Sequence, residues 1–150
     1  MTSRKLPLTP AYRPNERGFL NLTHSYFGAV DILLERLFKR HSSYREGDAE
    51  MLFDPIMFLY RHAIECGLKY FLFSSLINQP VDTHNLDVLY KKLLPYLANV
   101  PKENLVSLEE TVEFYSQYDT KTGEAFRYPF SKKNSPFSKE VNGLNRVELR

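Results

Sequence analysis

Residues 54–72, DPIMFLYRHAIECGLKYFL, form the longest predominantly apolar stretch of the chain and decide its fold. Asp54 followed by Pro55 is typical of a helix start, because aspartate caps exposed N–H groups and proline lacks the N–H that the first turn leaves unpaired. We expect this helix to continue to about Ile77, where Asn-Gln-Pro at 78–80 ends it. A helix that is apolar around most of its circumference usually lies at the centre of a bundle.

Apolar residues recur at spacings of three and four on both sides of this stretch, which predicts further amphipathic helices. The first spans about residues 19–41, and the polar segment 42–50 after it is expected to be a loop. The last begins at Pro101 and fades at Tyr118, with Glu109, Glu110 and Glu113 facing outward.

A third helix is predicted between these two. Asp82 or Thr83 is expected to cap its start, and Pro95 is expected to kink or end it near Leu94, because proline breaks the backbone hydrogen bonds of a helix. The predicted fold is all-α, an antiparallel up-and-down bundle of about four helices.

The chain is expected to form a single helical domain over residues 18–150, preceded by an extended arm at 1–17 that carries three prolines. Residues 119–150 are rich in glycine, proline, lysine and serine and carry a basic and aromatic run. We expect this C-terminal part to be mostly loop or short extended structure.

Four ionisable side chains interrupt the central helix at Arg61, His62, Glu65 and Lys69. At about 100° per residue, Glu65 lies about 40°, Lys69 about 80° and His62 about 100° from Arg61, so all four share one stripe. One interpretation is a solvated face, on which Glu65 pairs with Arg61 and Lys69 at i±4. The other is a stripe that faces a cleft or a partner subunit, where grouped ionisable residues are functional candidates.

His84 is a second candidate and is predicted to lie in the first turn of the third helix. The helix dipole there disfavours the imidazolium form, and a neutral imidazole can act as a base. The alternative is structural, because a histidine beside a helix cap often bonds a loop carbonyl.

Arg127 lies beside Tyr128 in the aromatic run FRYPF. An arginine among aromatic rings can stack and direct its guanidinium toward a phosphate or carboxylate. It can equally form a structural pair with Asp119 or Glu65, and the sequence does not rank these alternatives.

The composition bounds the remaining possibilities. The chain has 150 residues, of which 43% are hydrophobic and 25% charged, and its formal net charge is +2, which gives no chain-wide footprint for nucleic acid. Cys66 is the single cysteine, which excludes an internal disulfide and a multi-cysteine zinc site. With no phosphate-binding glycine motif, metal-ligand spacing, signal peptide or membrane span in the sequence, we expect no cofactor, no metal, no membrane partner and a cytoplasmic location.

Three segments together resemble the HEPN (higher eukaryote and prokaryote nucleotide-binding) superfamily, and in particular its small bacterial members. They are FLYRHAIECGLKYFL at 58–72, THNLDVLYKKLL at 83–94 and EFYSQYDTKTGEAFRYPF at 113–130. The resemblance covers roughly residues 19–130. An Arg-x4–6-His motif of the kind many HEPN ribonucleases use is not assigned, because Arg36 and His41 lie about 140° apart on a helix.

The resemblance implies a homodimeric helical bundle that binds RNA or a nucleotide. It also implies a role such as metal-independent RNA cleavage in a toxin–antitoxin or phage-defence system, with a cognate antitoxin or defence-system protein as partner. The catalytic candidates are His62, His84 and Arg127, and the candidate RNA- or nucleotide-binding residues are Arg61, Glu65, Lys69, Asp119 and Tyr128. Whether the domain is catalytic at all stays open.

The alternative hypothesis is a non-catalytic helical interaction or dimerisation module, a subunit of a larger complex. In that case the stripe is an ion-pair seam that fixes helix register or a dimer interface. An open, positively charged stripe favours ligand binding, whereas closed ion pairs favour the seam.

Overall fold

The computed structural model describes residues 16–39, 46–75 and 81–118. These residues form four α-helices and one 3-10 turn: α1 (Glu16–Lys39), α2 (Glu46–Ser75), α3 (Leu86–Leu93), η1 (Leu94–Tyr96) and α4 (Lys102–Tyr118). No strand occurs among them. The all-α prediction is therefore confirmed.

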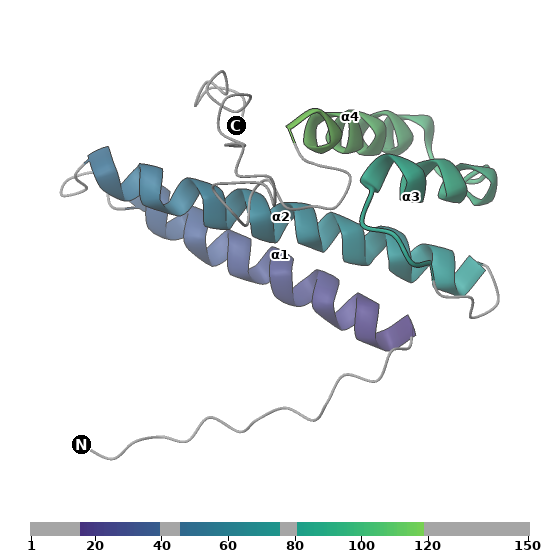
Figure 1. Ribbon diagram of the computed structural model, residues 1–150, viewed down its shortest axis with the longest axis horizontal. Coiled ribbons are helices and arrows are strands. Elements are labelled where there is room, and N and C mark those ends of the chain that lie inside the picture. The colour runs from purple at the N-terminus through teal and green to yellow at the C-terminus, as the bar shows by residue number, and fades with distance from the viewer. Residues whose placement is uncertain (1–15, 40–45, 76–80, 119–150) are drawn as a thin grey trace, which may run out of the picture.

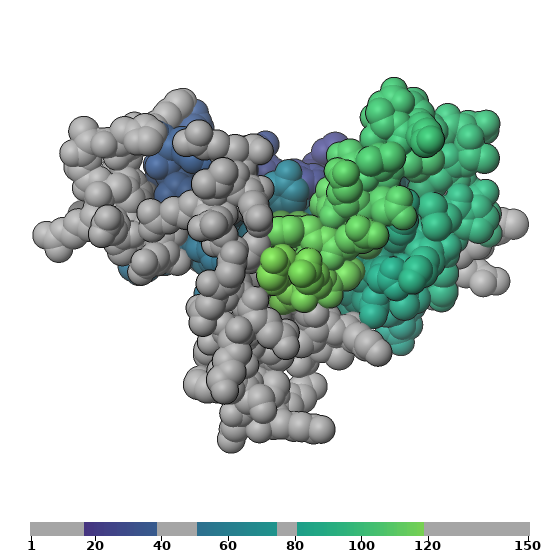
Figure 2. Space-filling model, turned by 90° about the horizontal axis from the view of Figure 1, so that it is seen from above, coloured from purple at the N-terminus to yellow at the C-terminus, as the bar shows by residue number. Residues whose placement is uncertain are grey.

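The central position predicted for the apolar helix is confirmed for α2. Figure 1 shows α1 and α2 running side by side in opposite directions, with α3 and α4 on the other side of α2. In the space-filling view, the side chains of α3 and α4 lie against each other and form one continuous surface (Figure 2). The described helices thus form a bundle around α2.

Aromatic and small residues join α1 to α2. Phe27 meets Tyr60 edge to face, with ring centroids 5.4 Å apart. Further along the same two helices, Gly67 faces Thr23, whose side chain would lie 3.6 Å from a Cβ added at the glycine, which is an ordinary contact distance. The interface between α1 and α2 therefore leaves room for a small side chain at Gly67.

The core lies between α2, α3 and α4. Its fully buried members come from all three helices, and the largest are Met57, Leu72, Leu89, Leu93 and Val112. Tyr115 of α4 reaches into this core, where its hydroxyl lies 3.9 Å from the sulfur of Met57. Burial of these apolar side chains is the main force that holds α3 and α4 against α2.

The predicted start of α2 is wrong. The helix begins at Glu46 rather than Asp54, so residues 46–50 are helical instead of loop, and Pro55 lies inside the helix. Proline in a helix interior costs about 3 kcal/mol relative to alanine. The extension places Phe53 against the core, and we attribute the continued helix to this burial.

The other boundaries mostly follow the predictions. α1 begins at Glu16, inside the predicted arm, and ends at Lys39. α3 ends at Leu93 and passes into the 3-10 turn that contains Pro95, as predicted. α4 ends at Tyr118, as predicted.

The predicted caps of α3 are wrong, because its N-cap is Asn85 rather than Asp82 or Thr83. The rest of the predicted N-terminal arm and the predicted C-terminal loop, residues 1–15 and 119–150, lie outside the described residues. Within the described part of the chain, no helix is both long enough and apolar enough to cross a membrane.

Candidate functional site

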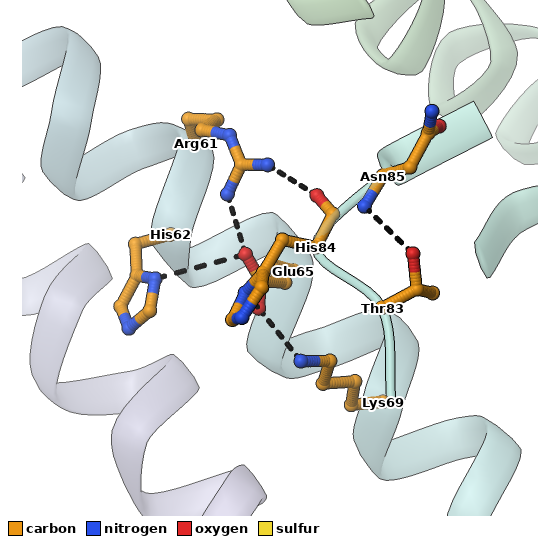
Figure 3. A network of polar contacts seen from close by, with 7 residues as sticks. All are labelled: Arg61, His62, Glu65, Lys69, Thr83, His84 and Asn85. Atoms are coloured by element: carbon orange, nitrogen blue, oxygen red, sulfur yellow. Dashed lines mark hydrogen bonds and ion pairs between the residues drawn. The ribbon is translucent and has the colours of Figure 1, made fainter. Parts of the chain in front are cut away.

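The carboxylate of Glu65 is the centre of a polar cluster on α2 (Figure 3). Its Oε2 accepts a hydrogen bond from Nη1 of Arg61 at 2.5 Å. Its Oε1 accepts one from Nζ of Lys69 at 2.8 Å. Both partners lie four positions away on the same helix, so the pairing that the spacing predicts is present.

The centre of this cluster is shielded from solvent. Arg61 and Glu65 are each 2% exposed, and Lys69 is mostly buried. A solvated face is therefore the wrong interpretation for these residues. The second terminal nitrogen of Arg61, Nη2, donates a hydrogen bond to the backbone carbonyl of His84, so Arg61 also ties α2 to the segment that leads into α3.

The pKa of Glu65 reflects this environment. Burial alone would raise it, but the hydrogen bonds and positive charges of Lys69 and Arg61 outweigh burial and lower the pKa from 4.5 to about 2. Glu65 is therefore an ionised carboxylate throughout the physiological pH range.

His84 lies outside α3, one residue before the N-cap, so the prediction that it sits in the first helical turn is wrong. Its Nδ1 is 2.8 Å from Oε1 of Glu65, and its side chain is 55% exposed. A carboxylate oxygen only accepts hydrogen bonds, so Nδ1 carries the proton. The nitrogen left to exchange a proton with a ligand is Nε2.

The residues on either side of His84 fix its main chain. The hydroxyl of Thr83 accepts a hydrogen bond from the backbone N–H of Asn85 at 3.2 Å. The side chain of Asn85 in turn accepts one from the N–H of Val88 at 3.1 Å and caps α3. The cap at Asn85 was not expected from the sequence, although asparagine three residues before a free helix N–H is a recognisable capping pattern.

His62 approaches the same carboxylate from the other side. Its Nδ1 lies 3.9 Å from Oε2 of Glu65, which is within ion-pair range but too long for a hydrogen bond. Its ring stacks on Phe58 with ring centroids 5.6 Å apart, and it packs in a T-shaped arrangement with Tyr26 of α1 at a centroid distance of 4.7 Å. The His62 side chain is 28% exposed, so part of the ring faces solvent.

The structure thus brings together five of the residues predicted to form the site: Arg61, His62, Glu65, Lys69 and His84. The other three, Asp119, Arg127 and Tyr128, lie outside the described residues. Among residues 16–39, 46–75 and 81–118, no group of three or more histidine, cysteine or acidic side chains is arranged to hold a metal ion.

The chemistry that this cluster can perform follows from the imidazole of His84, which Glu65 holds through Nδ1. A histidine whose Nδ1–H is bonded to a carboxylate has a fixed tautomer, and its Nε2 can accept a proton or, once charged, donate one.

Protein-family models, curated proteins and solved structures were all compared with the chain, and none matched it. Function is therefore inferred from the contacts around Glu65.

Proposed function

We propose that this chain is a HEPN-like helical domain that binds RNA or a nucleotide, and that His84 exchanges a proton with the ligand. The observation that carries the proposal is the 2.8 Å contact between Nδ1 of His84 and the buried Glu65 carboxylate. It leaves Nε2 of a half-exposed imidazole as the reactive nitrogen. A carboxylate that orients a histidine in this way recurs in acid–base catalysis.

Metal-independent cleavage of RNA is the specific reaction proposed for this site. Nε2 of His84 takes the proton of a ribose 2′-hydroxyl, whose oxygen then attacks the neighbouring phosphorus. The bond from phosphorus to the 5′-oxygen of the next nucleotide breaks, and that oxygen takes up a proton. The partly exposed His62 is the proposed donor of this second proton.

The phosphate ligands of the proposal differ from those expected on sequence. Arg61 is buried, and both of its terminal nitrogens bond within the protein, to Glu65 and to the His84 carbonyl. Of the three candidate phosphate ligands we therefore drop Arg61 and keep Lys69 and Arg127, of which Arg127 lies outside the described residues. A cytoplasmic location, as in toxin–antitoxin and phage-defence systems, accompanies this proposal.

A labelled mixed-sequence RNA tests the proposal. We would measure binding and cleavage in excess EDTA by the wild type, by His84→Ala and by His24→Ala, which removes an exposed histidine of α1. The proposal predicts that His84→Ala abolishes cleavage and that His24→Ala leaves it unchanged. Equal activity of His84→Ala and the wild type would contradict it. RNA that is bound but never cleaved would retain the binding role and remove the ribonuclease role.

The second candidate is a non-catalytic interaction or dimerisation module. The closed ion pairs of Arg61, Glu65 and Lys69 favour it, because a buried network of this kind can fix how two segments pack. Sedimentation over a range of protein concentrations, with and without RNA, separates the two candidates. A stable dimer, or a stable complex with a co-purified antitoxin or defence protein, that ignores RNA would favour the module.

A further inference from the structure

We infer that Arg61 is a positioning residue for His84, and that it holds this histidine by the main chain and by the ring together. The inference deepens the proposed function, on which its meaning for ligand binding rests. It assigns Arg61 a role other than the phosphate ligand expected from its charge.

The contacts form a closed circuit. Nη1 of Arg61 donates to Oε2 of Glu65 at 2.5 Å, and Oε1 of Glu65 accepts from Nδ1 of His84 at 2.8 Å. Nη2 of Arg61 donates to the carbonyl oxygen of His84 and completes the circuit. The ring and the peptide of one residue are thus bound to the same guanidinium, the ring through Glu65.

Arginine suits this task for a geometric reason. Its guanidinium is a rigid planar fork whose two terminal nitrogens point at different acceptors at once, whereas lysine offers a single nitrogen on a flexible stem. The side chains of Arg61 and Glu65 are each 3% exposed, so water competes little for these bonds. Lysine at this position would keep the charge and lose one of the two contacts.

The Arg61 bridge would hold the exposed ring of His84 in one orientation. Thr83 and Asn85 fix the main chain beside His84, but their hydrogen bonds leave its side-chain torsions unrestrained. The Arg61 bridge sets the separation between α2 and the His84 peptide. That separation decides whether Nδ1 reaches Glu65.

Lys69 provides a matched comparison. It donates to Oε1 of Glu65 at 2.8 Å, and the same oxygen contacts Nδ1 of His84. Among the described residues, no hydrogen bond joins Lys69 to the main chain of His84. Removing Lys69 therefore changes the charge beside the carboxylate but leaves the Arg61 bridge between Glu65 and the His84 carbonyl in place. Arg61→Lys keeps the charge beside the carboxylate but breaks this bridge.

The tautomer of His84 is the direct readout. We would record the nitrogen chemical shifts of its imidazole in basic buffer, at a pH above which these shifts no longer change. The wild type and Lys69→Met are expected to hold the proton on Nδ1. Arg61→Lys is expected to give a mixture of tautomers and to weaken RNA cleavage by about ten- to a hundredfold, because small displacements of a catalytic group are costly. An Arg61→Lys protein that keeps the wild-type tautomer would overturn the inference.

A measurement on the unmodified protein covers the case in which Arg61→Lys does not fold. Two separate acceptors block rotation of the guanidinium, so the Nη protons of Arg61 should give separate signals in the wild type. A single averaged signal would overturn the inference. Because neither readout uses RNA, a tautomer that changes in Arg61→Lys without any RNA activity in the wild type would refute the proposed function and support the positioning role.

Discussion

Nδ1 of His84 lies 2.8 Å from Oε1 of Glu65, although 19 positions separate the two residues and one lies in a helix, the other in a connecting segment. The contact joins the middle of α2 to the residue before the cap of α3. It depends on a buried carboxylate that Arg61 and Lys69 keep ionised. The proposed site therefore depends on the ionised carboxylate of Glu65.

Replacing Glu65 with alanine should strongly destabilise the fold, because it leaves Arg61 buried without its carboxylate. We expect the free energy of unfolding, measured by urea denaturation, to fall by about 3–5 kcal/mol. Asp87→Ala is the matched control, since Asp87 and Lys91 form an i,i+4 pair at 2.8 Å, the same distance as between Glu65 and Lys69, with side chains 45% and 68% exposed. That change should cost under about 1 kcal/mol. Similar losses in both variants would contradict the account.

Acid should weaken the protein through Glu65 in a defined window. Its pKa is about 2 in the folded state against 4.5 ordinarily, so its ionised form stabilises the fold above about pH 4.5. This contribution is lost as the pH falls from there toward 2. The shift corresponds to about 3 kcal/mol.

Glu65→Gln isolates this effect from the other carboxylates, because glutamine does not titrate. The difference in free energy of unfolding between wild type and Glu65→Gln should shrink by about 3 kcal/mol between pH 6 and pH 2. A difference that stays constant over this range would show that Glu65 is not held ionised by its neighbours.

The start of α2 can be tested at Asp54 and Pro55, which the structure places inside the helix. Pro55→Ala should raise the free energy of unfolding by about 1–3 kcal/mol, since alanine restores a helical hydrogen bond. Asp54→Ala should be neutral or slightly stabilising. If the helix instead began at Asp54, this second change would remove a cap and cost about 1 kcal/mol.

Cys66 should react slowly with thiol reagents in the folded protein. It is buried, and burial together with the nearby Glu65 charge raises the pKa of its thiol to about 11. Thiolate is the reactive form, so little of it is present at pH 8. We expect a slow absorbance change with an aromatic disulfide reagent in buffer and a fast, stoichiometric one in concentrated urea. Equal rates would contradict burial of this residue.

The sequence predicts best what depends on spacing within one helix. The central place of α2 follows from its apolar circumference, and the pairing of Glu65 with Arg61 and Lys69 follows from i±4 geometry. The end of α3 follows from Pro95, whose effect on the helical backbone is local.

Features that depend on tertiary packing are not predicted from the sequence. Asp54 and Pro55 carry a strong local start signal, yet the helix extends through them and places Phe53 against the core. The partner of His84 lies on another element, so no local pattern identifies it. Burial of Arg61 has the same origin, because a connecting segment supplies the carbonyl that its second nitrogen binds.

The central claim is that ligand binds at the two histidines beside Glu65. The most direct test is to follow the imidazole signals of the wild-type protein by NMR while a short mixed-sequence RNA is added. The account predicts that the signals of His62 and His84 shift with RNA concentration and saturate together, while the signal of the exposed His24 stays in place. The account is contradicted if the signals of His62 and His84 do not move even at RNA concentrations that saturate binding.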